Sequence, residues 1–416
     1  MTWKRALRAR SARLQGSLRA KVFVRSKSAL ADFDLAQGWN LRERIPVLRR
    51  RVARPLRRAA VGLGTRGWPA QSRLFLAYDV EGWVLEYEAR QLERTARALG
   101  VAIGPGGWVK GVDRQSIFHL SQFTLLLHDF ERRENRLGFA YFHGRPGTPG
   151  MPEFDACFET LRRRHAEFDR VQVTSSAMQE LILETGIAAE KLHRIPIGID
   201  TGVFRPRTPQ SRSDARRALG LPESAFVVGS FQKDGVGWED GLEPKLIKGP
   251  DVLLAVAERL RERVPELMVL LTGPSRGYVR AGLERLGVPY RHALLPSIDT
   301  VSQAYEAIDV CLVTSRDEGG PRAVLEAMAT DVPLVTTRVG QALDLVRHGV
   351  NGWIVDVEDV DGLVGWTAHV AEAPAGELAG LLEAGRITAD ANAYEALRPR
   401  WRELFRGFVA MPELGG

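Results

Sequence analysis

The sequence predicts an α/β protein made of two doubly wound parallel-sheet domains that face a cleft. Three observations support this. From Arg73 onward, short apolar segments alternate with amphipathic ones, and this alternation stops at residues 205–213 and then restarts. The apolar segments are continuous, as in strands that are buried on both faces of a sheet. The interrupting stretch is rich in Pro, Arg and Ser, which indicates a linker between two halves.

The first half contains the strands and helices of a predicted domain spanning residues 73–206. The predicted strands are 74–78, one within 116–127, 138–143, 171–175 and 192–196, and the predicted helices are 86–98 and 176–185. In open parallel sheets, ligands bind beyond the carboxyl ends of the strands. We therefore expect functional side chains in the loops that follow these strands.

The second half repeats the alternation over a predicted domain of residues 207–390. The predicted strands are 225–231, 267–271, 310–314 and 333–336, and the predicted helices are 251–264, 279–286, one ending at 305–307, and 322–329. A last helix at 394–408 lies in the terminal segment 391–416. We expect this segment to pack back on the N-terminal domain.

The positive charge of the chain is concentrated before the first domain. Residues 1–72 hold 18 of the 58 Lys and Arg but only 3 of the 51 Asp and Glu, so the remaining residues carry 40 basic and 48 acidic side chains. The body of the protein is therefore mildly acidic. A mildly acidic body argues against nucleic acid as a partner of the whole protein.

The basic extension, residues 1–72, has the pattern of an amphipathic helix. Apolar residues recur at spacings of four and seven with arginines between them, at positions Trp3, Leu7, Leu14, Leu18 and Val22. Such a segment suits an anionic membrane surface or an acidic partner. Two alternatives remain open: an arm that is disordered or docks on the body, and an organelle transit peptide.

Other features of the composition indicate a cytoplasmic protein, peripheral at most to a membrane. The sequence has no apolar run of about 18 residues, the length that spans a bilayer. Its start lacks the apolar core and cleavage site of a secretory signal. The two cysteines, Cys157 and Cys311, lie far apart in apolar segments, which favours neither a disulfide framework nor a zinc site.

The segment 318–326 carries the clearest chemical pattern. Strand 310–314 leads into a loop that ends in Gly319, Gly320 and Pro321, and a helix follows. The glycines allow backbone N–H groups to approach a ligand closely, proline suits the first helical position, and the helix start is a ready anion site. Glu326 stands in an apolar helical run. Burying a carboxylate there is costly without a cationic or hydroxyl-rich partner.

This segment resembles the retaining glycosyltransferases of family 4, which have the GT-B fold of two Rossmann-like domains. The resemblance rests on Glu318 and Glu326, separated by seven residues, and on the following Ala-Met-Ala and Val332–Thr336. It extends over about residues 73–410. It implies that Glu318 contacts the donor sugar and that Glu326 binds the ribose of the nucleotide. It also places the Gly319–Arg322 segment, with Gly320 and Pro321, in the donor site.

The resemblance further implies two cations for the donor diphosphate. Lys248, followed by Gly249, matches the family's Lys-Gly pair before the first helix of the donor domain. The other cation is usually Arg after a Gly, and here the role is carried over to Lys233. The intervening loop, 234–246, is longer than usual and would cover the donor.

The remaining predicted site residues lie in the first domain. The family's histidine that faces the sugar is best matched by His143 after strand 138–143, with His119 as the competing candidate. Gly82 and Trp83, after the first strand, occupy the loop that usually shapes the acceptor side.

The resemblance predicts a retaining hexosyltransferase that uses a nucleotide sugar as co-substrate, with no metal and no cofactor. The acceptor would be a hydroxyl of a glycan or of a lipid-linked sugar in polysaccharide or cell-envelope biosynthesis. The lysines and the helix start would stabilise the departing diphosphate. Two alternatives remain: a nucleotide-sugar epimerase or glycoside phosphorylase on the same fold, and a catalytically inactive scaffold.

Overall fold

The structure is a computed structural model of the chain. It describes residues 72–78, 84–104, 111–126, 134–237, 239–295, 297, 300–374 and 376–412. The predicted extension, apart from Ser72, lies outside the described residues, and so do Gly82 and Trp83. No helix in the described part of the chain is both long enough and apolar enough to span a bilayer.

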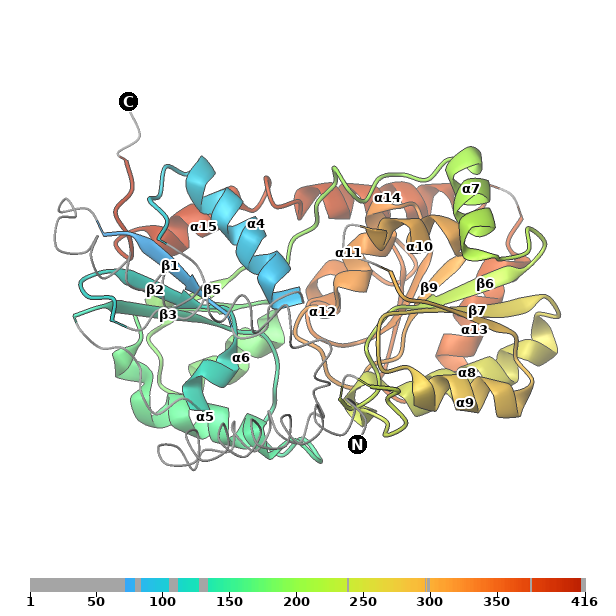
Figure 1. Cartoon of the computed structure of the whole chain (residues 1–416), viewed down its shortest axis with the longest axis horizontal. Coiled ribbons are helices and arrows are strands. Elements are labelled where there is room, and N and C mark those ends of the chain that lie inside the picture. The colour runs from blue at the N-terminus through green and yellow to red at the C-terminus, as the bar shows by residue number, and fades with distance from the viewer. Residues whose placement is uncertain are drawn as a thin grey trace, which may run out of the picture.

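The N-terminal sheet is parallel, and its strands follow one another in the order β1-β2-β3-β4-β5 (Figure 1). These strands are β1 Leu74–Ala77, β2 Ser116–His119, β3 Arg136–Tyr141, β4 Arg170–Val173 and β5 Leu192–Arg194. One face is covered by α5 and α6 and the other by α4 and α15. Their bounds are α4 Val84–Ala98, α5 Pro152–Arg164, α6 Ser176–Leu183 and α15 Arg398–Phe405.

The C-terminal sheet is also parallel, but its strand order, β11-β10-β9-β6-β7-β8, reverses direction once. Its strands are β6 Phe226–Ser230, β7 Leu267–Thr272, β8 Tyr290–Ala293, β9 Val310–Val313, β10 Leu334–Thr337 and β11 Trp353–Val355. The chain leaves β6 toward β7 and β8, then returns to β9 on the other side. The border between β6 and β9 is therefore the switch point at which such sheets bind ligands.

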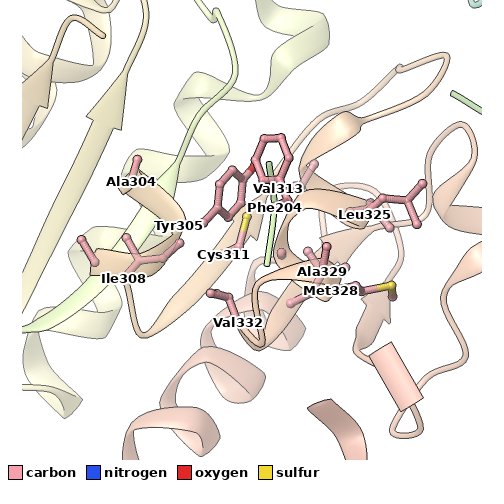
Figure 2. Close-up of a cluster of buried hydrophobic side chains, with 14 of the residues drawn as sticks. Phe204, Ala304, Tyr305, Ile308, Cys311, Val313, Leu325, Met328, Ala329 and Val332 are labelled. Atoms are coloured by element: carbon pink, nitrogen blue, oxygen red, sulfur yellow. The ribbon is translucent and has the colours of Figure 1, made fainter. Parts of the chain in front are cut away.

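Helices cover both faces of the C-terminal sheet. On one face lie α7 Pro209–Leu219, α10 Ser302–Ala307, α11 Arg322–Ala329 and α14 Ala379–Ala391. On the other lie α8 Pro250–Arg263, α9 Gly277–Leu286 and α13 Val360–Glu372, while the short α12 spans Ala342–Leu345. Figure 2 shows the apolar cluster behind α11, which gathers Tyr305, Cys311 and Met328. The predicted fold of two parallel-sheet domains is confirmed.

The structure corrects several predicted elements. The stretch 205–213 is not all linker, because α7 begins at Pro209. Thr208 and Ser211 form a reciprocal capping box at its start, and Gly220 closes its end in a left-handed conformation. The prediction also lacked elements α5, β8, α12, β11, α13 and α14.

The end of the chain crosses from the second domain to the first. The predicted helix 394–408 is shorter in the structure, where α15 spans Arg398–Phe405. Its Trp401 ring meets Phe118 of β2 edge-to-face, with centroids 6.0 Å apart. α14 lies over the C-terminal sheet, whereas α15 lies against the N-terminal one (Figure 1). The two domains therefore share this last segment.

Candidate functional site at the domain cleft

The centre of the candidate site is the loop that joins β9 to α11 at the switch point. Strand β9 is fully buried, so it fixes where this loop begins. Pro321 has φ −60° and ψ 104°, and the helix starts at Arg322. The prediction that Pro321 occupies the first helical position is therefore wrong, because its extended ψ makes it the capping residue just before the helix.

Glu318 is held at the end of this loop by a lysine from the β6 side. The Lys248 Nζ lies 2.5 Å from Glu318 Oε2, and the two side chains are only 15% and 13% exposed. The Ser315 hydroxyl donates to Glu318 Oε1 at 3.0 Å. Both oxygens of the carboxylate therefore have a partner. The structure brings together Glu318 and Lys248, two residues that the sequence predicted for one site.

Two further lysines stand near Lys248, and one of them was missed by the sequence interpretation. Burial lowers the pKa of Lys233, a predicted site residue, to about 8. Burial also lowers the pKa of Lys245 to about 8, and the neighbouring charges of Lys248 and Lys233 add to this effect. We call Lys233, Lys245, Lys248 and Glu318 the lysine cluster. Lys245 was overlooked because it lies in the long loop 234–246.

That loop is folded back on the second domain. Its base is fixed by Asp234 and Arg276, whose Oδ1 and Nε lie 2.9 Å apart with both side chains fully buried. Its tip docks on the start of α9, where the Tyr278 N–H donates to the Gly241 carbonyl at 2.9 Å. Gly241 has φ 71°, and an added Cβ would lie 2.4 Å from the Ser275 backbone. These contacts give the loop a defined shape.

Gly319 and Gly320, both predicted for the donor site, pack closely against the other domain. A Cβ at Gly319 would lie 2.3 Å from the Phe142 carbonyl oxygen, and one at Gly320 would lie 2.7 Å from the Ile197 side chain. The Thr174 hydroxyl donates to the Gly319 carbonyl. In this structure Gly319 therefore admits the backbone of the other domain, and Gly320 admits the Ile197 side chain.

Arg322 and Glu326, both predicted for the donor site, lie in a buried network between the domains. Arg322 Nε lies 3.1 Å from Glu326 Oε1 on the same helix, and Arg322 Nη1 pairs with Glu88 of α4. Tyr394 donates to Glu88 at 2.9 Å, and Tyr305 donates to Glu326 at 2.8 Å. We call these five residues the arginine network.

Burial governs the electrostatics of the arginine network. Glu326 is 6% exposed, so it does not lie on a solvated face of its helix. The cation and hydroxyl that its burial requires come from the protein itself. Burial raises the pKa of Glu88, and this effect outweighs the opposing effects of Arg322 and Tyr394.

The two candidate histidines have different surroundings. His143 Nδ1 lies 3.8 Å from Asp317 Oδ2, and both atoms are buried without a hydrogen-bond partner in the described residues. Burial alone would raise the pKa of Asp317, but His143 and Lys248 hold it below its usual value. His119 instead shares a 3.0 Å hydrogen bond with the Thr124 hydroxyl, and burial lowers its pKa to about 4. Only His143 therefore faces the loop of Glu318.

A cavity of about 530 Å³ opens beside Glu318 between the two domains. Its apolar lining comes from both domains and consists of Pro149, Ala177, Met178, Leu246, Ile247, Val339 and Leu343. Its charged lining includes Arg145, Asp317 and Glu318. Among the described residues, no group of three or more His, Cys, Asp or Glu side chains could hold a metal ion. Glu318 is thus the predicted site residue that borders open space.

Comparison with solved structures identifies the fold. The chain superposes on Anabaena Alr3699/HepE, solved in complex with UDP and glucose, with a TM-score of 0.64 at 18% identity over 80% of this chain and all of that one. Sucrose-phosphate synthase from Thermosynechococcus elongatus gives a TM-score of 0.62 at 18% identity, over 81% of this chain and 99% of that one. The fold is GT-B.

The sequence comparisons concern mainly one part of the chain. Residues 241–371 match the family described as Glycosyl transferases group 1. D-inositol 3-phosphate glycosyltransferase from Corynebacterium urealyticum is 32% identical over 233 residues, 52% of this chain and 51% of that protein. Its counterpart from Segniliparus rotundus is 30% identical over 264 residues, which are 59% of this chain and 55% of that protein. The chain thus spans about half the length of the curated relatives it matches.

Proposed function

We propose that this GT-B protein is a retaining glycosyltransferase that moves a hexosyl group from a nucleotide-diphosphate sugar to an acceptor hydroxyl. The observation that carries the proposal is the Lys248–Glu318 pair at the switch point, of which Glu318 lines an interdomain cavity. The match of residues 241–371 to glycosyl transferases group 1 supports it. The relatives named as glycosyltransferases and the structural neighbour solved with UDP and glucose support it as well.

The proposed chemistry requires a stabilised leaving group. The acceptor oxygen forms a bond to the anomeric carbon on the face that the phosphate vacates, and the carbon–oxygen bond to the phosphate breaks with its electron pair on the phosphate. The acceptor proton passes to that phosphate oxygen. Lys233 and Lys248 offset the negative charge that develops, without a metal, and each preorganised group lowers the barrier by about 3 kcal/mol.

The remaining residues receive roles from this arrangement. Glu318 contacts the donor sugar, and His143, held near Asp317, faces the sugar from the other domain. Glu326 accepts from the ribose hydroxyls, because a carboxylate offers about four lone-pair sites and the described contacts use two of them. The cavity presents both charged and apolar side chains, which suits a glycan or lipid-linked acceptor.

The transfer reaction is tested directly with radiolabelled UDP-, GDP- and ADP-sugars and cell-envelope acceptors. We expect labelled product from one donor, with the anomeric configuration retained by NMR and with activity unchanged by EDTA. Lys248→Met should lower the rate about 100-fold. Release of an epimerised nucleotide sugar without acceptor would replace the transferase assignment by that of an epimerase. Equal rates in Lys248→Met and the parent protein would refute the assigned site.

We also propose that residues 1–72 bring the enzyme to an anionic membrane surface. This stretch has 18 basic and 3 acidic residues, whereas the rest of the chain is mildly acidic. Such an excess of Lys and Arg attracts acidic lipids. In a flotation assay, the full chain should rise with phosphatidylserine vesicles. A chain that starts at residue 73 should remain in the bottom fraction. Equal flotation of both would contradict this role.

A further inference from the structure

The long loop after β6 closes as a hairpin and returns the chain to the end of that strand. The Val236 N–H donates to the Glu243 carbonyl at 2.9 Å, and the Lys245 N–H donates to the Asp234 carbonyl at 2.7 Å. The closure places the backbone of Lys245 beside Asp234, the residue that follows Lys233. Lys245, which lies twelve positions after Lys233 in the chain, is thereby brought to the switch point.

A single turn of 3₁₀ helix then links Lys245 to Lys248. The turn spans Leu246–Lys248, and the Lys248 N–H donates to the Lys245 carbonyl at 2.8 Å. Lys245 is the residue that caps this turn, three positions before Lys248. The two ammonium groups lie close enough for the charge of Lys248 to act on Lys245. The nearby charge of Glu318 acts on Lys245 as well.

Of this pair, Lys248 has a carboxylate at ion-pair distance, whereas Lys245 has none among the described residues. Glu318 is committed to Lys248 at 2.5 Å and to the Ser315 hydroxyl. Within the described ranges, no carboxylate lies within 4.0 Å of the Lys245 ammonium. Glu153 of α5 acts on it only from a greater distance. A half-buried ammonium in such surroundings is costly unless an anion joins it.

We infer that Lys245 is an additional phosphate-binding residue, which contacts the diphosphate of the nucleotide sugar together with Lys248. The inference rests on the proposed function and adds a third lysine to Lys233 and Lys248. Lys245 would supply the charge-assisted hydrogen bonds that a phosphate oxygen accepts.

The loop holds Lys245 in place before any ligand arrives. Arg276 donates to the Ser230 carbonyl at 2.7 Å and to the Thr272 carbonyl at 3.0 Å, and it also pairs with Asp234. These bonds tie the ends of β6 and β7 to the base of the hairpin. A loop whose backbone is already fixed loses little freedom when a ligand binds, so more of the interaction energy appears as affinity.

The charge state of Lys245 gives the inference a pH signature. Burial lowers its pKa to about 8, helped by Lys248 and Lys233 and opposed by Glu318 and Glu153. A bound phosphate favours the charged ammonium and so raises this pKa again. Binding at pH 8 should therefore take up protons, and the affinity should fall between pH 7 and pH 9.

The test uses the full chain and two probes, pyrophosphate and UDP, in isothermal titration calorimetry. Lys245→Met should weaken both probes about tenfold to a hundredfold. Lys245→Arg keeps the cation and should stay within about threefold of the parent protein. Lys191→Met, a matched change in the N-terminal domain, should have no effect. Titrations at pH 8 in buffers of different ionisation enthalpy should show less proton uptake for Lys245→Met.

The outcomes separate the inference from the proposed function. If neither probe binds the parent protein, the proposed donor site fails. A different result would overturn only the additional role of Lys245. In that case both probes bind the parent protein and Lys248→Met weakens them, but Lys245→Met matches the parent protein in affinity and proton uptake. If Lys245→Met does not fold, the inference is tested with Lys245→Arg and with the pH dependence of the parent protein. The absence of proton uptake at pH 8 would then overturn the role of Lys245.

Discussion

The two charged clusters at the cleft are built in opposite ways. In the arginine network, Glu88 and Glu326 each have Arg322 and one tyrosine hydroxyl as partners, and all are buried. In the lysine cluster, Glu318 pairs with Lys248, and Lys245 has no carboxylate within 4.0 Å among the described residues. The arginine network, in which both carboxylates are partnered, joins the two domains. The lysine cluster, in which Lys245 has no such partner in the described part of the chain, lies at the strand ends, where parallel sheets bind ligands.

The largest effect that this comparison predicts is on stability. Arg322→Met removes the cation that Glu88 and Glu326 share, leaving two carboxylates buried without it. Breaking a buried ion pair in this way costs about 3–5 kcal/mol. Urea denaturation followed by fluorescence measures it. Arg97→Met, which removes an exposed pair with Glu93 on α4, should change stability by less than about 1 kcal/mol. Similar midpoints for both variants would show that the network does not join the domains.

Much of the fold and the centre of the site could be predicted because their signals are local. The apolar segment of β9 is followed directly by the loop and helix α11. Glu318 and Lys248 are each followed by glycines that match the family's pattern. α14 gave no such signal, since among its residues only Gly385 and Ala389 are buried and its apolar stripe is weak. A helix of that kind is held by its tertiary contacts rather than by its own pattern.

Other features of the site depend on contacts between distant parts of the chain. Lys245 reaches the site through a hairpin whose base is fixed by Asp234 and Arg276, and these two residues are 42 positions apart. Gly319 is packed by the Phe142 carbonyl of the other domain. Nothing in the local sequence identifies either partner. Local sequence therefore indicates the type of residue required, while the domain packing decides what that residue contacts.

The second prediction separates binding from transfer within the lysine cluster. Glu318→Gln should lower the transfer rate about 100-fold, because the contact that favours the sugar's transition state is lost. The same change removes a negative charge beside Lys248, so pyrophosphate should bind about threefold to tenfold more tightly. Calorimetry and the transfer assay measure the two effects. A parallel loss of both would mean that Glu318 maintains the cluster instead of contacting the sugar.

Glu326 belongs to the arginine network in this structure, but its predicted role is to bind the ribose. Glu326→Gln should weaken UDP about tenfold through the lost hydrogen bonds to the charged group, and it should leave pyrophosphate unchanged. Calorimetry with both probes distinguishes these results. Equal affinities of the variant and the parent protein for UDP would restrict Glu326 to its structural partners, Arg322 and Tyr305.

The smallest predicted effect concerns a single hydroxyl of the arginine network. Tyr394 donates to Glu88 at 2.9 Å and accepts from Arg322 at 3.3 Å, while the ion pair itself does not depend on it. Tyr394→Phe should therefore lower the free energy of unfolding by about 1 kcal/mol, the net value of one hydrogen bond. Tyr290→Phe removes a hydroxyl that bonds Glu284 at the surface and should have a smaller effect. Pyrophosphate affinity should be the same in both variants, because neither tyrosine contacts the lysine cluster. A loss of pyrophosphate affinity in Tyr394→Phe alone would mean that the two clusters are coupled across the cleft and do not act separately.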